Sequence, residues 1–158
     1  MRKPHGNHLR KGRHSEAGRT YLVTTATARR LRYFDDLYLG RLVVKAMHHA
    51  HAAGDVSSLC FVVMPDHLHW LFELGERRTL SEVMNRFKTW TAHEINRTLG
   101  ERGQVWQQGF HDHALRAQED LRSIARYVVA NPLRAGIVTE IGMYPLWDAV
   151  WLEGGEVL

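Results

Sequence analysis

The sequence predicts an α+β fold, in which helices pack on an antiparallel sheet. Segments of strand and helix character are interspersed along the 158 residues, and hydrophobic residues make up 44% of them, an ordinary globular share. Two adjoining strand-like segments are joined by a single Pro-Asp pair. So short a connection requires antiparallel strands, because a parallel pair needs a long crossover. One domain accounts for this length, since domains typically have about 100–200 residues.

A strand and a helix are predicted first. Residues 20–27 are rich in β-branched side chains and tyrosine, which favour a strand. Over residues 35–53, leucine, valine, alanine and methionine recur at the spacing of one helix face. Gly54 stands where that helix would end.

A β-hairpin is predicted next. The apolar run 57–64 predicts a buried strand, and residues 67–74 predict the strand that pairs with it. Residues 65–66, proline and aspartate, are typical of a turn. Trp70 and Trp90 keep the spacing of core residues in their segments, so both are predicted to pack inside.

Two more helices are predicted in the second half of the chain. Thr79 or Ser81 can cap the first of them, and Gly100 can end it. The segment 103–116 is expected to be extended or looped. The last helix is predicted over about residues 118–130, after which an Asn-Pro pair breaks the pattern.

Composition excludes several classes of protein. A single cysteine, Cys60, rules out an internal disulfide framework and a cysteine-rich zinc module. The sequence has no apolar run of the roughly 18 residues that span a membrane, and its start lacks the apolar stretch of a signal peptide. We expect a cytoplasmic protein with three parts: a basic flexible leader (residues 1–18), one domain (19–143) and a C-terminal tail (144–158).

Basic residues are concentrated at the start of the chain. Residues 1–32 hold nine Lys and Arg against one acid, Glu16, whereas the whole chain holds 21 against 17. The first 32 residues therefore carry a net charge of +8 and the remaining 126 residues −4. Lys and Arg neutralise phosphates, so this asymmetry suggests a polyanionic partner such as nucleic acid. A solvated tail would show the same charge pattern.

His67 and His69 are the sharpest local feature. In a strand, residues i and i+2 point to the same face, so the imidazoles project together and make half of a divalent-metal site. Two histidines on a half-exposed strand are the alternative. Two further His-X-His pairs occur, His49/His51 and His111/His113. The first lies on a predicted helix, where i and i+2 do not face each other, and the second remains a competitor.

Tyr127 lies in the last predicted helix with apolar neighbours, and a tyrosine there is usually a core residue with its hydroxyl at the rim. Asn131 follows four residues later, near the same helix face. Asn131 also precedes Pro132, so it can instead cap a short turn that begins at the proline.

Four blocks of this sequence resemble one family. FVVMPDHLHWLFEL resembles the His-hydrophobic-His core of the single-tyrosine HUH transposases, and YVVANPLRAGIV resembles the Tyr-x-x-x-Asn-Pro-x-Arg-Ala-Gly segment of one branch, the REP-associated tyrosine transposases. YLVTTATARR and VWQQGFHDHALR look like two further blocks of that branch. The resemblance covers roughly residues 19–138. The order of the four blocks makes the match specific, although each block alone is degenerate.

The resemblance implies a fold and a chemistry. Members of this family have a ferredoxin-like α+β fold and cleave and rejoin single-stranded DNA through a 5′-phosphotyrosine. Tyr127 would be the nucleophile, and His67 and His69 would hold a divalent metal, Mg²⁺ or Mn²⁺. Asn131 stands where classical members have a glutamine as third metal ligand. The expected setting is the bacterial cytosol, in association with the nucleoid.

Members of this branch act on short repeated palindromes that fold as single-stranded DNA hairpins, so we expect hairpin DNA as partner and a monomer or homodimer. Candidate DNA-binding residues are Arg10, Lys11, Arg13, His14, Arg19, His113 and Arg116. Two other functions stay open: a non-catalytic, sequence-specific DNA-binding protein of the same fold, and a metal-dependent hydrolase. A histidine-triad hydrolase is excluded, because a leucine occupies position 71 where that motif needs a third histidine.

Overall fold

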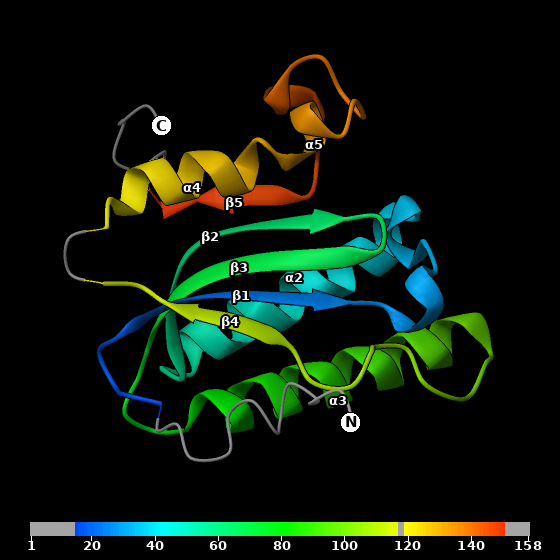
Figure 1. Cartoon of the computed structure of the whole chain (residues 1–158). Helices are drawn as coiled ribbons and strands as arrows, with labels where there is room; N and C mark the ends of the chain where they lie inside the picture. Colours follow the sequence, from blue (N-terminus) through cyan, green and yellow to red (C-terminus); the bar gives the residue numbers. More distant parts are fainter. Residues whose placement is uncertain (1–14, 117–118, 151–158) are drawn as a thin grey trace, which may run out of the picture.

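A computed structural model describes residues 15–116 and 119–150 of the chain. It contains a five-stranded antiparallel sheet with strand order β4-β1-β3-β2-β5 and helices packed on it (Figure 1), which confirms the predicted α+β fold. The strands are β1 (Thr20–Ala26), β2 (Val56–Met64), β3 (His67–Leu74), β4 (His111–Ala114) and β5 (Trp147–Ala149). The predicted hairpin is confirmed as the β2–β3 pair.

The three longer helices begin at side-chain caps that the sequence contains, whereas the shortest helix has none. The helices are α2 (Leu37–Ala52), α3 (Leu80–Leu99), α4 (Leu121–Val129) and the short α5 (Asn131–Arg134), with 3-10 turns η1 (Ala28–Arg30), η2 (Tyr33–Asp35) and η3 (Ile141–Met143). Asp36 caps α2, and Thr79 forms a capping box with Glu82 at the start of α3. Gly100 ends α3 in the left-handed conformation, with φ of 66°.

The two faces of the sheet are covered unequally. Burial alternates along β1, so only one of its faces is covered, whereas Cys60–Met64 of β2 are buried without a break, so both faces are covered there. Trp70 of β3 packs on Phe87 of α3, which identifies the covered face as the one beneath α2 and α3. Helix α4 lies on the opposite face, along β2 and β5 (Figure 1), so that within the described part of the chain the side of β1 and β4 is open.

The sheet extends into the predicted C-terminal tail. Trp147–Ala149 form β5, which pairs antiparallel with β2 at Val62, Phe61 and Cys60. Leu146, which precedes β5, is buried against Gly40 of α2. A side chain at position 40 would collide with that of Leu146. Apolar and polar residues do not alternate along the segment that leads into β5. Pairing with β2 is therefore what makes Trp147–Ala149 a strand.

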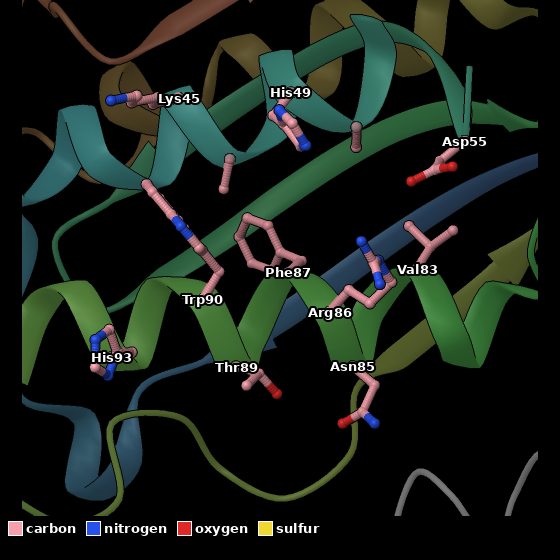
Figure 2. A pocket seen from close by; sticks show the side chains of 12 residues that line it. Lys45, His49, Asp55, Val83, Asn85, Arg86, Phe87, Thr89, Trp90 and His93 are labelled. Carbon is pink, nitrogen blue, oxygen red and sulfur yellow. The ribbon is translucent and has the colours of Figure 1, made fainter. Parts of the chain in front are cut away.

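Trp90 does not pack in the core, contrary to the prediction, whereas Trp70 is fully buried as predicted. The side chain of Trp90 is 38% exposed in a groove of about 570 Å³ between α2 and α3. Figure 2 shows Trp90 and Arg86 of α3 facing the small side chains of α2 beside Lys45 and His49. Because Ala46 and Ala50 are short, α2 leaves space opposite the indole.

Among the described residues, no helix combines the length and the hydropathy that a membrane-spanning helix needs.

Candidate functional site

His67 and His69 project together from the open face of the sheet, as strand alternation predicts. Trp70 and Phe72 alternate with them and point into the core, so the histidines lie on the side of α4. Their ring centroids are 5.0 Å apart and the ring planes are nearly perpendicular, at 89°. Both side chains are partly buried. The two imidazoles are therefore close enough to share one ligand.

Each imidazole is oriented through its Nδ1 atom. The Nδ1 atom of His67 lies 2.7 Å from Oδ1 of Asp66, and Nδ1 of His69 lies 2.9 Å from Oγ1 of Thr24 on β1. A hydrogen on Nδ1 satisfies both contacts and leaves the Nε2 lone pairs available. Within the described part of the chain, neither Nε2 has a hydrogen-bond partner. Metal-binding histidines show this arrangement, in which an outer group fixes the tautomer, so the pair fits a divalent ion.

His69 is uncharged at neutral pH. Burial, the neighbouring His67 and the positive charge of Arg134 lower the pKa of His69 to about 4. A neutral imidazole is the form that binds a metal ion. The environment of His69 therefore favours the metal-binding protonation state.

Acidification of the metal-free protein is expected to destabilise the fold through His69. The pKa of His69 is lower in the folded chain than in the unfolded chain, so the unfolded chain takes up this proton first as the pH falls. The neutral imidazole's contribution to the free energy of unfolding is therefore complete above about pH 6.5 and is lost as the pH falls toward 4. The loss amounts to at most about 3 kcal/mol. Thermal melts of the wild type and of His69→Gln between pH 7 and 4.5 measure it: the wild type should lose more stability. Identical pH dependence would contradict the prediction.

Asn131 is the candidate for a third ligand. Within the described residues, His, Cys, Asp and Glu form no cluster of three that could hold a metal, so a third ligand from this part of the chain would be of another type. Asn131 is the first residue of α5, and its Nδ2 donates to the carbonyl of Val128 at 2.8 Å. This leaves the side-chain oxygen of Asn131 as the atom that could bind a metal ion. The alternative of an N-cap before Pro132 is wrong, because Ala130 occupies the cap position.

Tyr127 is not a core residue, since its side chain is 64% exposed. The guanidinium carbon of Arg134, on α5, lies 3.8 Å from the centre of the Tyr127 ring. The same guanidinium is near enough to His69 for its charge to lower the pKa of that residue. Arg134 therefore contacts the tyrosine on α4 and lies within electrostatic range of His69 on β3, although these residues are far apart in sequence.

The second His-X-His pair lies on β4, the edge strand beside β1. His111 pairs with Thr24, which pairs on its other side with His69, so the three side chains form one row across the open face. His113 pairs with Leu22, one step further from His69, and its Nε2 lies 3.1 Å from Glu119. The structure thus places His111 in line with His69, whereas His113, a predicted DNA-binding residue, lies two positions further along β4.

Arg19 and Arg116 lie at the opposite end of the sheet from His67. Both line an open hollow of about 660 Å³ together with Glu16 and Glu119. Arg19 forms an ion pair with Glu16 at 3.5 Å, and the backbone N–H of Arg116 donates to Glu119. These acids offset part of the positive charge. The other candidate DNA-binding residues lie outside the described part of the chain: Arg10, Lys11, Arg13 and His14.

The sequence analysis did not assign two polar residues beside the histidines, Asp66 and Thr24, to the site. Asp66 belongs to the predicted turn, yet its carboxylate contacts His67 and accepts from Nε of Arg30 at 2.9 Å. Burial raises the pKa of Asp66, but the hydrogen bonds from Arg30 and His67 outweigh it and lower the pKa overall. Thr24 is one of several threonines in a predicted strand. Only its register opposite His69 distinguishes it.

Comparison with known families and curated proteins agrees with the resemblance seen in the four sequence blocks. Residues 18–131 match the family model described as "Transposase IS200 like". A REP-associated tyrosine transposase of Escherichia coli K12 is 27% identical over 85 residues, which are 54% of this chain and 49% of that protein. The chain spans about half the length of the curated relatives that it matches. The predicted resemblance is thereby confirmed.

Solved structures share the fold. A REP-associated tyrosine transposase bound to a REP hairpin superposes with a TM-score of 0.69 and 23% identity, over 85% of this chain and 79% of that one. A candidate transposase from Deinococcus radiodurans superposes with a TM-score of 0.52 and 17% identity, over 83% of this chain and 97% of that one. At these identities the likeness establishes the architecture.

Proposed function

Because the chain belongs to the IS200-like transposase family, whose model covers residues 18–131, we propose that it cleaves and rejoins single-stranded DNA flanking a hairpin. One observation carries the proposal: Arg134 stacks on an exposed Tyr127 while its charge reaches His69, whose Nε2 has no partner among the described residues. A nucleophile and a metal-binding pair in one neighbourhood are what phosphoryl transfer to a tyrosine requires.

The metal site would consist of side chains already oriented for it. His67 and His69 would bind through Nε2, and Asn131 through its side-chain oxygen. Mg²⁺ or Mn²⁺ there would supply positive charge that polarises the scissile phosphate. Asp66 and Thr24 would keep the two imidazoles in the tautomer that exposes Nε2.

Tyr127 would act as the nucleophile. Its hydroxyl oxygen attacks phosphorus, the bond from phosphorus to the 3′ oxygen breaks, and that oxygen takes up a proton to become a free 3′-hydroxyl. The 5′-phosphate remains on the tyrosine. Because the covalent link conserves the phosphodiester, the 3′-hydroxyl of another strand can reverse the step and join without ATP. The adjacent Arg134 cation would stabilise negative charge that develops on the phenol oxygen.

The DNA partner would be a hairpin with a single-stranded flank. A hairpin is supported by the structural relative that is bound to a REP hairpin. The open face with His69, Thr24 and His111 would receive the flank. The basic leader, with Arg10, Lys11, Arg13 and His14, would add phosphate contacts, and so would Arg19, His113 and Arg116. The chain would act as a monomer or homodimer.

A denaturing gel tests the proposal directly. The protein is incubated with Mg²⁺ or Mn²⁺ and labelled hairpin DNA that carries single-stranded flanks. A covalent protein–DNA adduct is expected. Cleavage without an adduct would indicate a hydrolase, and binding without cleavage would indicate a recognition protein.

Asn131→Ala is expected to raise the metal concentration needed for cleavage by about tenfold or more. It should also cost about 1 kcal/mol of stability, because the hydrogen bond to Val128 is lost. Asn131→Asp is the matched variant: it loses the same donor but keeps a ligand oxygen, so it should be destabilised while retaining metal affinity. Metal titrations of cleavage and thermal melts measure both. Unchanged metal dependence in Asn131→Ala would leave the site with two protein ligands.

A further inference from the structure

Two consecutive residues after β1 have a backbone conformation that side chains disfavour. Arg29 and Arg30 have φ values of 55° and 53°. In this left-handed region the Cβ atom of an L-residue crowds its own carbonyl oxygen, so glycine is the usual occupant. Strained residues of this kind persist where the surrounding structure enforces them, and they are concentrated at functional sites.

The turn is fastened on both sides by hydrogen bonds. The fully buried Thr27 donates its backbone N–H to the carbonyl of Asp66 at 2.9 Å and its hydroxyl to the carbonyl of Leu31 at 2.8 Å. The N–H of Ala28 donates to the carbonyl of Val105 at 2.8 Å. These bonds hold the turn against both the β2–β3 turn and the loop before β4. These hydrogen bonds therefore fix the position of the backbone at Arg29 and Arg30.

This turn places the Arg30 guanidinium beside His67. Its Nε donates to Oδ2 of Asp66 at 2.9 Å, and one terminal nitrogen lies 3.5 Å from Nδ1 of His67. Because Nδ1 of His67 is engaged with Asp66 at 2.7 Å, it offers Arg30 no good acceptor. A guanidinium has five N–H donors, and the Arg30 side chain is 55% exposed. Donors remain for an anion that arrives next to His67.

We propose that Arg30 binds a phosphodiester of the single-stranded DNA flank beside His67, an inference that rests on the proposed function. The planar fork of arginine matches two phosphate oxygens, and Asp66 keeps that fork from swinging into solvent. Arg29 has the same backbone strain and the same charge. Among the described residues it forms no hydrogen bond or ion pair with Asp66 or His67, so it is the natural control.

The experiment compares Arg30→Gly with Arg29→Gly. Each variant removes one positive charge and one strained side chain, and glycine accepts the backbone. Arg30→Gly also removes the exposed ion pair with Asp66, but the relief of backbone strain should offset it, so neither variant should lower the melting temperature appreciably. Binding is measured by fluorescence anisotropy in EDTA. On hairpin DNA with a single-stranded flank, Arg30→Gly should weaken affinity by about tenfold and Arg29→Gly by less than about threefold. On the bare hairpin the two variants should bind alike.

Three results would overturn the assignment. Equal losses in both variants would mean that Arg30 adds only general charge. A loss that persists on the bare hairpin would place Arg30 at the duplex. Weaker Mn²⁺ binding by Arg30→Gly in calorimetry, without a loss of DNA affinity in EDTA, would mean that Arg30 acts only through Asp66 and His67. A wild-type chain that forms no adduct would refute the proposed function separately, because these binding assays need no cleavage.

Discussion

Replacing Tyr127 by phenylalanine is expected to abolish the covalent protein–DNA adduct and DNA cleavage to the detection limit. The variant removes the only atom that would attack phosphorus and keeps the aromatic ring that lies beneath Arg134. Since the side chain is 64% exposed, the fold and the melting temperature should not change. Hairpin binding should also be retained. The adduct assay, a cleavage assay and anisotropy with hairpin DNA measure these effects.

Two other tyrosines provide controls for that experiment. Tyr38 of α2 is 59% exposed on the opposite side of the sheet, so Tyr38→Phe should leave the adduct unchanged. The buried hydroxyl of Tyr144 donates to the carbonyl of Val63, and burial raises the pKa of Tyr144 to about 12. Tyr144→Phe should therefore cost about 1 kcal/mol of stability without loss of the adduct. An adduct that survives in Tyr127→Phe and disappears in Tyr144→Phe would reverse the assignment.

Removal of either histidine of the β3 pair is expected to stop cleavage while leaving DNA binding in EDTA nearly intact. His67→Ala and His69→Ala each delete one Nε2 donor, so metal affinity should fall by more than about 100-fold, beyond the loss usual for outer groups. A chelator should stop cleavage by the wild-type protein in the same way. Calorimetry with Mn²⁺ and the cleavage rate measure the two effects.

His111→Ala is the matched control for the histidine experiment. His111 also lies on the open face, in one row with Thr24 and His69, but on the edge strand. Its removal should leave Mn²⁺ affinity unchanged and affect the DNA contact alone. If His111→Ala abolished metal binding while His67→Ala did not, the metal site would belong to the other pair.

Local sequence patterns predicted the elements that position the site. The apolar run and the Pro-Asp pair predicted the β2–β3 hairpin, and alternation along β3 placed His67 and His69 on one face. The cap at Thr79 and the end at Gly100 were correct, because capping depends on residues within one helix turn. Periodicity was a poorer guide to burial: Trp90 has core spacing, but its exposure depends on the small residues that α2 presents opposite it.

The candidate site itself depends on contacts that no local pattern specifies. Arg30 and Asp66 are 36 positions apart, and Thr24 meets His69 only through the β1–β3 register. Strand β5 forms because β2 offers it an edge, and Asn131 turns back to Val128 rather than capping a turn. The sequence by itself therefore determined strands β1 to β3, the three longer helices and the candidate residue types, through interactions between near neighbours along the chain. The tertiary structure decided which of those residues meet, because packing and strand register bring together groups that are distant in sequence.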